Sequence, residues 1–171
     1  MSALAHPRLA LRPMLPADMP LLVEIFRESI AELTSDDYSE AQQEAWLMAA
    51  DDEQQFAARL GKQLTLIATL GGSPIGFVSL AGADTIDMLY VHPAAAGQGA
   101  GAMLLDALEK LAASRGAQKL KVDASDTALG FFQKRGYTAK QRNSVALEGE
   151  WLANTSMEKP LPRQAEQGKP Q

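Results

Sequence analysis

The 171-residue sequence contains no cysteine and only two histidines, His6 and His92. Without cysteine, the chain has no disulfide, no thiolate zinc ligand and no cysteine nucleophile. Two histidines so distant in the sequence also exclude a His-rich metal site. We therefore expect no metal, although carboxylates alone can bind a hard cation.

Positive charge and long apolar runs are scarce as well. The formal net charge is −5, which argues against binding to nucleic acid or to an anionic membrane surface. No window approaches the roughly 20 apolar residues of a membrane span, and the first ten residues lack the apolar stretch of a signal peptide. We expect a cytoplasmic protein whose mildly acidic surface suits an amine-bearing small molecule.

The composition and the placement of polar and proline-rich segments indicate one globular domain. Hydrophobic residues make up 46% of the chain and charged residues 22%, as in ordinary soluble domains. Residues 1–8 and 160–171 are polar or rich in proline, so we interpret both as flexible tails around a single domain at 9–159.

Residue patterns predict alternating helices and strands. The predicted strands are Leu9–Met14, Gln63–Leu70, Ile75–Leu80, Thr85–Val91, Lys119–Ala124, Tyr137–Arg142 and Val145–Met157. The predicted helices are Met19–Leu33 after an Asp18 N-cap, one capped by Ser39, one from Asp51-Asp52 to Gly61, Gly101–Arg115, and one from Ser125-Asp126-Thr127 to Lys134. This order predicts a mixed α/β fold in which one crossover helix joins two neighbouring strands in parallel.

The segment from Leu89 to Ala102 is the most informative part of the sequence. A strand ends, small residues follow, and a helix begins among Gly97, Gly99 and Gly101. The first amides of a helix have no intrahelical partner and lie at the positive end of its dipole. Because glycine lets an anion approach closely, this helix start can hold a phosphate or pyrophosphate.

Two other interpretations of these glycines remain open. They can simply form a tight turn, or they can belong to a dinucleotide-binding fingerprint, since Gly97, Gly99 and Ala102 fit G-x-G-x-x-A and Asp123 follows the next strand. The dinucleotide fingerprint expects glycine directly at the strand end, whereas residues 92–96 intervene here. A Walker loop is excluded because no Gly-Lys-Ser/Thr occurs.

The run LYVHPAAAGQGAGAMLLDALEKLA resembles the acetyl-CoA-binding motif Q/R-x-x-G-x-G/A of the GCN5-related N-acetyltransferase (GNAT) superfamily. The run VDASDTALGFFQKRGY resembles the second cofactor segment of that family. Together with the order of the elements, the resemblance extends from Leu9 to Leu161. One departure is that Ala96 stands where the family motif opens with Gln or Arg.

The resemblance implies a central, mostly antiparallel sheet with one parallel βαβ crossover, flanked by helices, and acetyl-CoA as cosubstrate. It also implies which residues bind acetyl-CoA: Leu89, Tyr90, Val91, Gly97, Gln98, Gly99, Ala100, Gly101, Ala102, Ser125, Phe131 and Phe132. The first two helices of the family line the acceptor pocket, so Tyr38 and Trp46 are candidate acceptor-binding residues. A core role for both aromatics is the alternative. The family further suggests a homodimer.

The reaction of this family is the direct attack of an amine on a thioester. An amine with a pKa of about 10 is mostly protonated at neutral pH, so a carboxylate is the natural base. Asp87, which we also expect to contact the acceptor, is the first candidate, and a solvated carboxylate on the strand face is the alternative. Asp123 and Asp126 are weaker candidates, since Asp126 can instead cap its helix.

A tyrosine after the fifth strand serves as the general acid in many members of the family. Phe131-Phe132 occupies that region here, so Ser125, Tyr90 or Tyr137 must replace it, or the thiolate leaves unprotonated. His92 fits a structural role before Pro93.

Three functions are consistent with these residues: a small-molecule amine N-acetyltransferase, a catalytically impaired acyl-CoA-binding module suggested by Ala96 and the missing tyrosine, and a nicotinamide-dinucleotide-binding protein.

Overall fold

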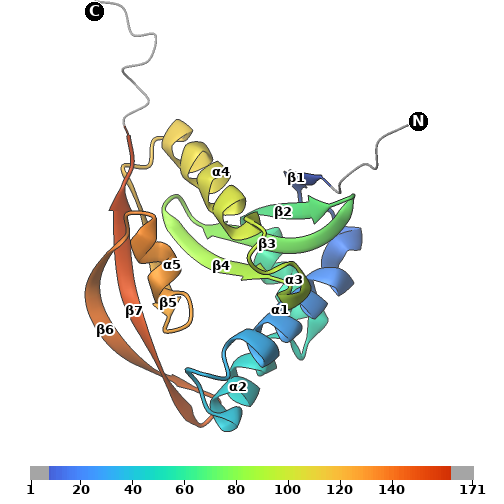
Figure 1. The fold of residues 1–171 in the computed structure, drawn as a ribbon, viewed down its shortest axis with the longest axis vertical. Coiled ribbons are helices and arrows are strands. Elements are labelled where there is room, and N and C mark those ends of the chain that lie inside the picture. The colour runs from blue at the N-terminus through green and yellow to red at the C-terminus, as the bar shows by residue number, and fades with distance from the viewer. Residues whose placement is uncertain (1–7, 163–171) are drawn as a thin grey trace, which may run out of the picture.

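The computed structural model describes residues 8–162, which form a seven-stranded sheet with helices on both faces (Figure 1). The strands are β1 (Leu9–Pro13), β2 (Leu64–Leu70), β3 (Ser73–Ala81), β4 (Thr85–Val91), β5 (Lys119–Ser125), β6 (Thr138–Leu147) and β7 (Glu150–Pro160). The α-helices are α1 (Met19–Leu33), α2 (Glu40–Leu47), α3 (Glu53–Gly61), α4 (Ala100–Ser114) and α5 (Leu129–Lys134).

The strand order is β1-β2-β3-β4-β5-β7-β6. Within the described residues every neighbouring pair is antiparallel except β4 and β5, which are parallel and are joined through α4. The prediction of a mixed, mostly antiparallel sheet with one crossover is therefore confirmed. A crossover of this kind needs a long connection, because parallel strands cannot be joined by a hairpin.

Two apolar clusters cover the two faces of the sheet. On one face, α4 and α5 pack against β2–β5 through residues such as Leu104, Leu108 and Phe132. On the other face, α1 and α3 contribute Phe26 and Phe56, whose ring centroids lie 5.2 Å apart.

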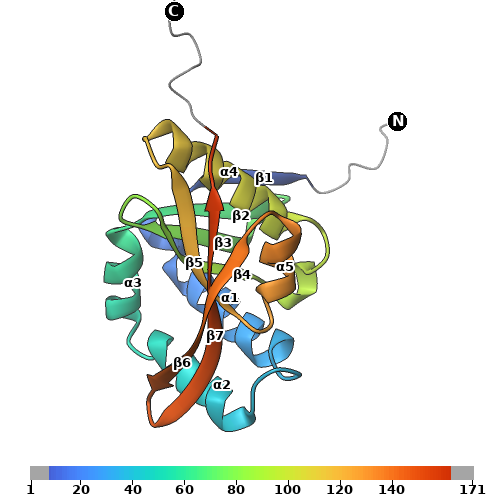
Figure 2. The ribbon, with the colours of Figure 1, turned by 90° about the vertical axis from the view of Figure 1, so that its left-hand side faces the viewer.

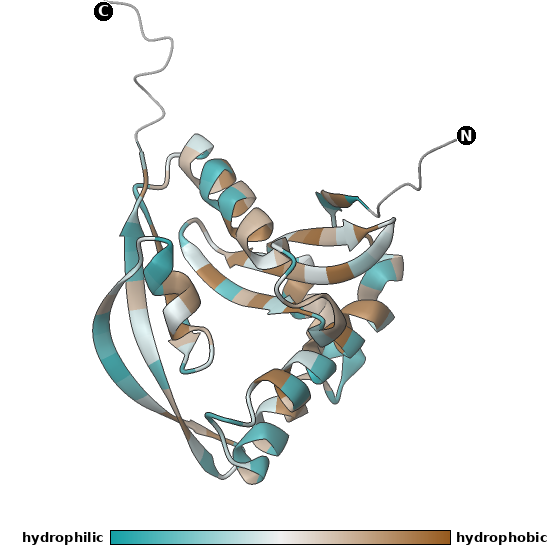
Figure 3. Ribbon diagram, in the orientation of Figure 1, coloured by the Kyte–Doolittle hydropathy of each residue, from teal (hydrophilic) through white to brown (hydrophobic). Residues whose placement is uncertain are grey.

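The outermost strand β6 is mostly hydrophilic (Figure 3), which suits a strand at the edge of a sheet. None of the described helices is long and apolar enough to cross a membrane.

The β6–β7 hairpin differs from its prediction. We predicted a break between Arg142 and Val145, but β6 continues to Leu147 and the chain turns at Glu148 and Gly149. Both turn residues have positive φ, 47° and 85°, which is the geometry of a tight two-residue hairpin turn. Asn-Gly and Asp-Gly are the usual signals for such a turn, so Glu-Gly gave a weak signal.

The predicted C-terminal boundary is also corrected. β7 extends through Pro160, beyond the predicted end at Met157, and Leu161 is buried with its amide donating to the Gln118 carbonyl. The domain therefore includes the first residues of the segment that we interpreted as a tail. Residues 1–7 and 163–171, on which the rest of the tail predictions fall, lie outside the described residues.

Asp18 does not cap α1 with its side chain, contrary to the prediction. Its carboxylate instead accepts two hydrogen bonds from the Arg12 guanidinium, at 2.8 and 2.7 Å, and one from the Leu15 amide at 2.7 Å. The hydrogen bonds from Arg12 hold the pKa of Asp18 below its ordinary value. This ion pair fixes β1 to the chain that enters α1.

We expect Asp18→Asn to lower the free energy of unfolding at pH 7 by about 1–2 kcal/mol. A lowered folded-state pKa contributes stability above the unfolded pKa of about 3.9, and this stability is lost as the pH falls through the folded-state pKa. Denaturant unfolding at pH 7 and at pH 3 should therefore show a smaller difference between variant and wild type at the lower pH. An equal difference at both values would contradict the ion-pair assignment.

Candidate active site

The site begins where β4 and β5 separate. The parallel pair has only two registered positions, Thr85 with Lys121 and Ile86 with Val122. Directly after them β4 contains a bulge, because Leu80 pairs with Ile86 and Ser79 with Met88, leaving Asp87 without a partner. A bulge bends its strand and redirects a side chain. The ends of β4 and β5 consequently diverge, as Figure 1 shows.

Two cavities meet between the diverging strands. The first has a volume of about 240 Å³ and lies among α2, β4, β5 and the β6–β7 hairpin. The second, of about 200 Å³, lies among α1, the end of β4 and the starts of α4 and α5. The two cavities share five of their lining residues: Trp46, Leu89, Tyr90, Ser125 and Ala128. Two molecules bound in the two cavities would therefore meet at the end of β4.

The glycine loop forms an open helix start beside the second cavity. Gly97 and Gly99 have φ of 81° and 92°, and Gly99 is the N-cap of α4. The first intrahelical bond runs from the Met103 amide to the Gly99 carbonyl at 3.0 Å. The four amides of residues 99–102 consequently point out of the helix end, where they can donate to an anion.

The same helix start leaves little space for a side chain at Gly101. A Cβ there would lie 3.3 Å from the ring of Phe131 in α5. The guanidinium of Arg135 in turn stacks on that ring, 4.0 Å from its centroid. The loop therefore has a flat aromatic wall with a cation behind it, which suits an elongated, phosphate-bearing molecule. Arg135 was not among the predicted site residues, although a basic residue one helical turn after Phe131 could have indicated it.

Asp87 lies on the wall of the first cavity and is tightly held. Arg59 of α3 donates to both of its carboxylate oxygens, at 2.8 and 2.7 Å, and Gln63 donates to it at 2.9 Å. Burial acts to raise the pKa of Asp87, but the bonds from Arg59 and Gln63 outweigh it, so the pKa lies below its ordinary value. A carboxylate held in this way is a poorer base than the one we inferred from the sequence.

Tyr90 and Trp46 form an aromatic pair at the junction of the two cavities. The Trp46 indole donates to the Tyr90 hydroxyl at 3.2 Å, and Tyr90 also packs edge-on against Phe26. Burial raises the pKa of Tyr90 strongly, against the smaller opposite effect of the Trp46 hydrogen bond. The hydroxyl therefore keeps its proton at neutral pH and is available to donate a hydrogen bond to a bound molecule.

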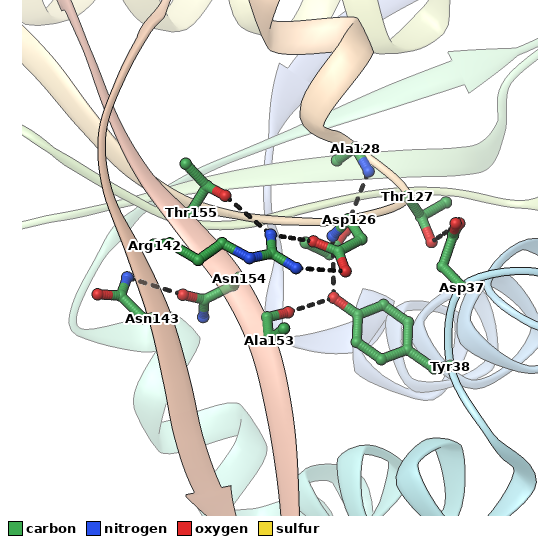
Figure 4. A network of polar contacts seen from close by, with 11 residues as sticks. Asp37, Tyr38, Asp126, Thr127, Ala128, Arg142, Asn143, Ala153, Asn154 and Thr155 are labelled. Atoms are coloured by element: carbon green, nitrogen blue, oxygen red, sulfur yellow. Dashed lines mark hydrogen bonds and ion pairs between the residues drawn. The ribbon is translucent and has the colours of Figure 1, made fainter.

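Tyr38 connects three segments around the first cavity (Figure 4). Its hydroxyl donates to the Ala153 carbonyl of β7 at 2.6 Å and accepts from the Asp126 amide at 2.9 Å. The Asp37 carboxylate beside it accepts from the Thr127 hydroxyl at 2.8 Å. Tyr38 lines the cavity. Its hydroxyl already forms two hydrogen bonds, which connect β7 to the segment before α5.

The residues that precede α5 have roles different from the predicted helix caps. α5 begins at Leu129, and the Ser125 hydroxyl accepts from the Ala128 amide at 3.1 Å. The Asp126 carboxylate forms a two-point ion pair with Arg142 of β6, at 2.5 and 3.0 Å, and caps no helix. Ser125 thus remains at the junction with a hydroxyl proton to donate, whereas Asp126 is a structural residue.

The other predicted site residues divide between the cavities and the core. Phe132 lines the first cavity and Phe131 the second. The Tyr137 hydroxyl instead donates to Glu109 at 2.8 Å, and its ring packs on Phe132 in the core beside α4. Burial and Glu109 together raise the pKa of Tyr137, and it lines neither cavity. We therefore propose no catalytic role for Tyr137.

His92 caps the short 3₁₀ helix that follows β4. Its Nδ1 accepts a hydrogen bond from the Ala94 amide at 3.1 Å, at the start of a short 3₁₀ helix over Pro93–Ala95. The side chain thus shapes the approach to the glycine loop. Ala96, which replaces the Gln or Arg of the family motif, is exposed.

Comparisons with known proteins agree with this architecture. Residues 34–161 match the family model of the acetyltransferase (GNAT) domain. The uncharacterized N-acetyltransferase YafP of Escherichia coli (strain K12) is 33% identical over 142 residues, 83% of this chain and 89% of YafP. The chain belongs to the GNAT family of N-acetyltransferases.

Solved structures show the same fold. A GCN5-related N-acetyltransferase from Rhodopseudomonas palustris is 62% identical, with a TM-score of 0.89 over 94% of this chain and all of that one. The PaiA N-acetyltransferase of Thermoplasma acidophilum, solved in complex with coenzyme A, is 21% identical, with a TM-score of 0.74 over 90% of this chain and 99% of that one.

Proposed function

We propose that the protein transfers an acetyl group from acetyl-CoA to the primary amine of a small acceptor. The observation that carries this proposal is the meeting of the two cavities at the end of β4, beside a helix start whose free amides suit a pyrophosphate. The coenzyme A bound by the related PaiA enzyme supports the same cosubstrate.

Acetyl-CoA would occupy the second cavity and the glycine loop. The amides of residues 99–102 would hold its pyrophosphate, with Gly97 and Gln98 in the approach to them, and Phe131 and Arg135 would flank it. The pantetheine arm would follow Leu89–Val91, because no strand of the described chain pairs with β4 on its β5 side beyond the bulge, and its backbone groups are free to bond there. Ala96 supplies no side-chain contact, so backbone amides carry the binding.

The acceptor would enter through the first cavity. Acetyl-CoA supplies an activated thioester: the amine nitrogen forms a bond to the carbonyl carbon, and the carbon–sulfur bond breaks. Of the three protons on the starting ammonium, one stays in the amide, one reaches the thiolate and one leaves to solvent. Ser125, whose hydroxyl proton is free at the junction, would donate to the departing sulfur, and Tyr90 would orient the acceptor as a neutral donor.

Titration calorimetry with acetyl-CoA, CoA and NAD tests the cosubstrate. We expect micromolar binding of both CoA compounds and none of NAD, because residues 92–96 separate the glycines from the end of β4, whereas the dinucleotide fingerprint places glycine directly at the strand end. Binding of NAD without CoA would refute the proposal and favour the dinucleotide interpretation.

Thiol release with a panel of primary amines tests catalysis separately. We expect acetyl-CoA to be consumed only when a suitable amine is present. A protein that binds CoA but acetylates no amine would instead be the catalytically impaired module, a function that Ala96 and the Phe131-Phe132 pair also suit.

A further inference from the structure

We propose that the acceptor is a small primary amine with a single positive charge and an apolar body, and that Asp123 binds its ammonium group. This inference rests on the proposed function, since it concerns the acceptor of the same transfer. It follows from the charges that line the first cavity, from the hydrogen bonds that reach Asp123, and from the apolar residues of the β6–β7 hairpin.

Three of the described residues that line the first cavity are charged: Arg59, Asp87 and Asp123. Two of them neutralise each other, because Arg59 and Asp87 form a two-point ion pair. Asp123 has no cation within ion-pairing distance among residues 8–162. The cavity therefore presents one uncompensated negative charge to whatever enters it.

Asp123 is held in place by neutral donors rather than by a cation. It lies directly opposite Ser156 in the β5–β7 register, and the Ser156 hydroxyl donates to its Oδ1 at 2.7 Å. The side-chain Nδ2 of Asn143 donates to Ser156 Oγ at 2.8 Å and to Asn154 Oδ1 at 2.9 Å. This chain of donors fixes the orientation of the carboxylate and leaves its charge intact, so a cationic ligand can still neutralise it.

The rest of the wall is largely apolar. Val145, Leu147 and Leu152 of the β6–β7 hairpin line the cavity together with Trp46 of α2. The hairpin lies beside α2 (Figure 2), where Gln42 donates to the Trp151 carbonyl at 2.7 Å. An aromatic or branched alkyl group would fill this space favourably, since binding removes apolar surface from water.

The same charge pattern disfavours two other classes of amine. The carboxylate of an amino acid would find the charge of Arg59 already compensated, because the Nε and Nη2 groups of its guanidinium bind Asp87. A polyamine would carry a second ammonium into a cavity whose only other lining carboxylate, among the described residues, is already paired. Both would bury an uncompensated charge, which is costly.

Steady-state acetylation of 2-phenylethylamine, L-phenylalanine and spermidine tests the acceptor class. We expect kcat/KM to be highest for 2-phenylethylamine by at least about tenfold, as burying one unpaired charge costs at least this much. A preference for L-phenylalanine or spermidine would overturn the inference. Failure to acetylate any amine, with CoA binding intact, would instead refute the proposed function.

Asp123→Asn tests the residue itself. We expect the KM for 2-phenylethylamine to rise about tenfold or more, with the Kd of acetyl-CoA unchanged, because only the ammonium contact is lost. Inhibition by the neutral isostere 2-phenylethanol should be unaffected, which a general loss of structure would not permit. Asp123→Glu should recover part of the affinity, and Asp106→Asn, an exposed residue of α4, is the matched control. An unchanged KM in Asp123→Asn would remove Asp123 from the site.

Discussion

Replacing Gly99 with valine should reduce the affinity for coenzyme A by about 100-fold or more, the loss expected when several charge-assisted amide contacts are removed together. Gly99 is the N-cap of α4, and its φ of 92° is a conformation that β-branched residues very rarely adopt. Among residues 8–162 no atom lies within 4 Å of a Cβ built there, so the side chain would project into open space at the start of the helix. Titration calorimetry measures the loss directly.

A matched control separates this steric effect from backbone strain. Gly116, at the other end of α4, has a φ of 96° and equally open surroundings. Gly116→Val should therefore cost similar stability, roughly 1–3 kcal/mol, without weakening coenzyme A binding. If both variants bind coenzyme A as the wild type does, the helix start is not the pyrophosphate site.

Gly76→Val should destabilise the fold and also weaken coenzyme A binding, although Gly76 lies in β3, outside the loop. A Cβ there would lie 3.0 Å from the Tyr90 carbonyl, 3.2 Å from Val91 and 3.4 Å from Leu104 of α4. Such overpacking costs about 1–3 kcal/mol. The strain would displace the end of β4, along which we place the pantetheine arm, so we expect affinity to fall about tenfold.

Denaturant unfolding and calorimetry on the same preparation would measure both effects. Gly61→Ala is the control, because Gly61 is exposed at the end of α3 and an added Cβ has no neighbour within 4 Å. That variant should keep the wild-type affinity and gain slightly in stability. Wild-type affinity in Gly76→Val would show that the end of β4 does not contribute to binding.

Local signals in the sequence were sufficient for much of the fold. The Leu104-Leu108 stripe and Gly116 predicted α4 closely, and Ser39 caps α2 by accepting from the Gln42 amide at 3.1 Å, as expected. Asp52 likewise caps α3. In each case the signal and the structure that it specifies lie within a few residues of each other, so tertiary contacts need not be known.

Contacts between distant segments could not be predicted in this way. Arg59 lies 28 residues from Asp87, yet it decides whether that carboxylate is free to act as a base. Asp126 was a plausible helix cap until Arg142, on a strand whose end was misplaced, proved to be its partner. A carboxylate in the sequence shows its chemistry but not its neighbours, and the neighbours set its charge and its role.

The Tyr38 hydroxyl also has a consequence for the order of folding. It bonds Ala153, which lies 115 residues further along the chain, and β7, which carries Ala153, is inserted between β5 and β6. Contacts of such sequence separation carry a high loop-closure entropy and form slowly. On the ribosome, every residue that lines the second cavity, up to Phe131, would emerge before β7, which helps to close the first cavity. The growing chain should therefore contain the whole lining of the second cavity before it can complete the first.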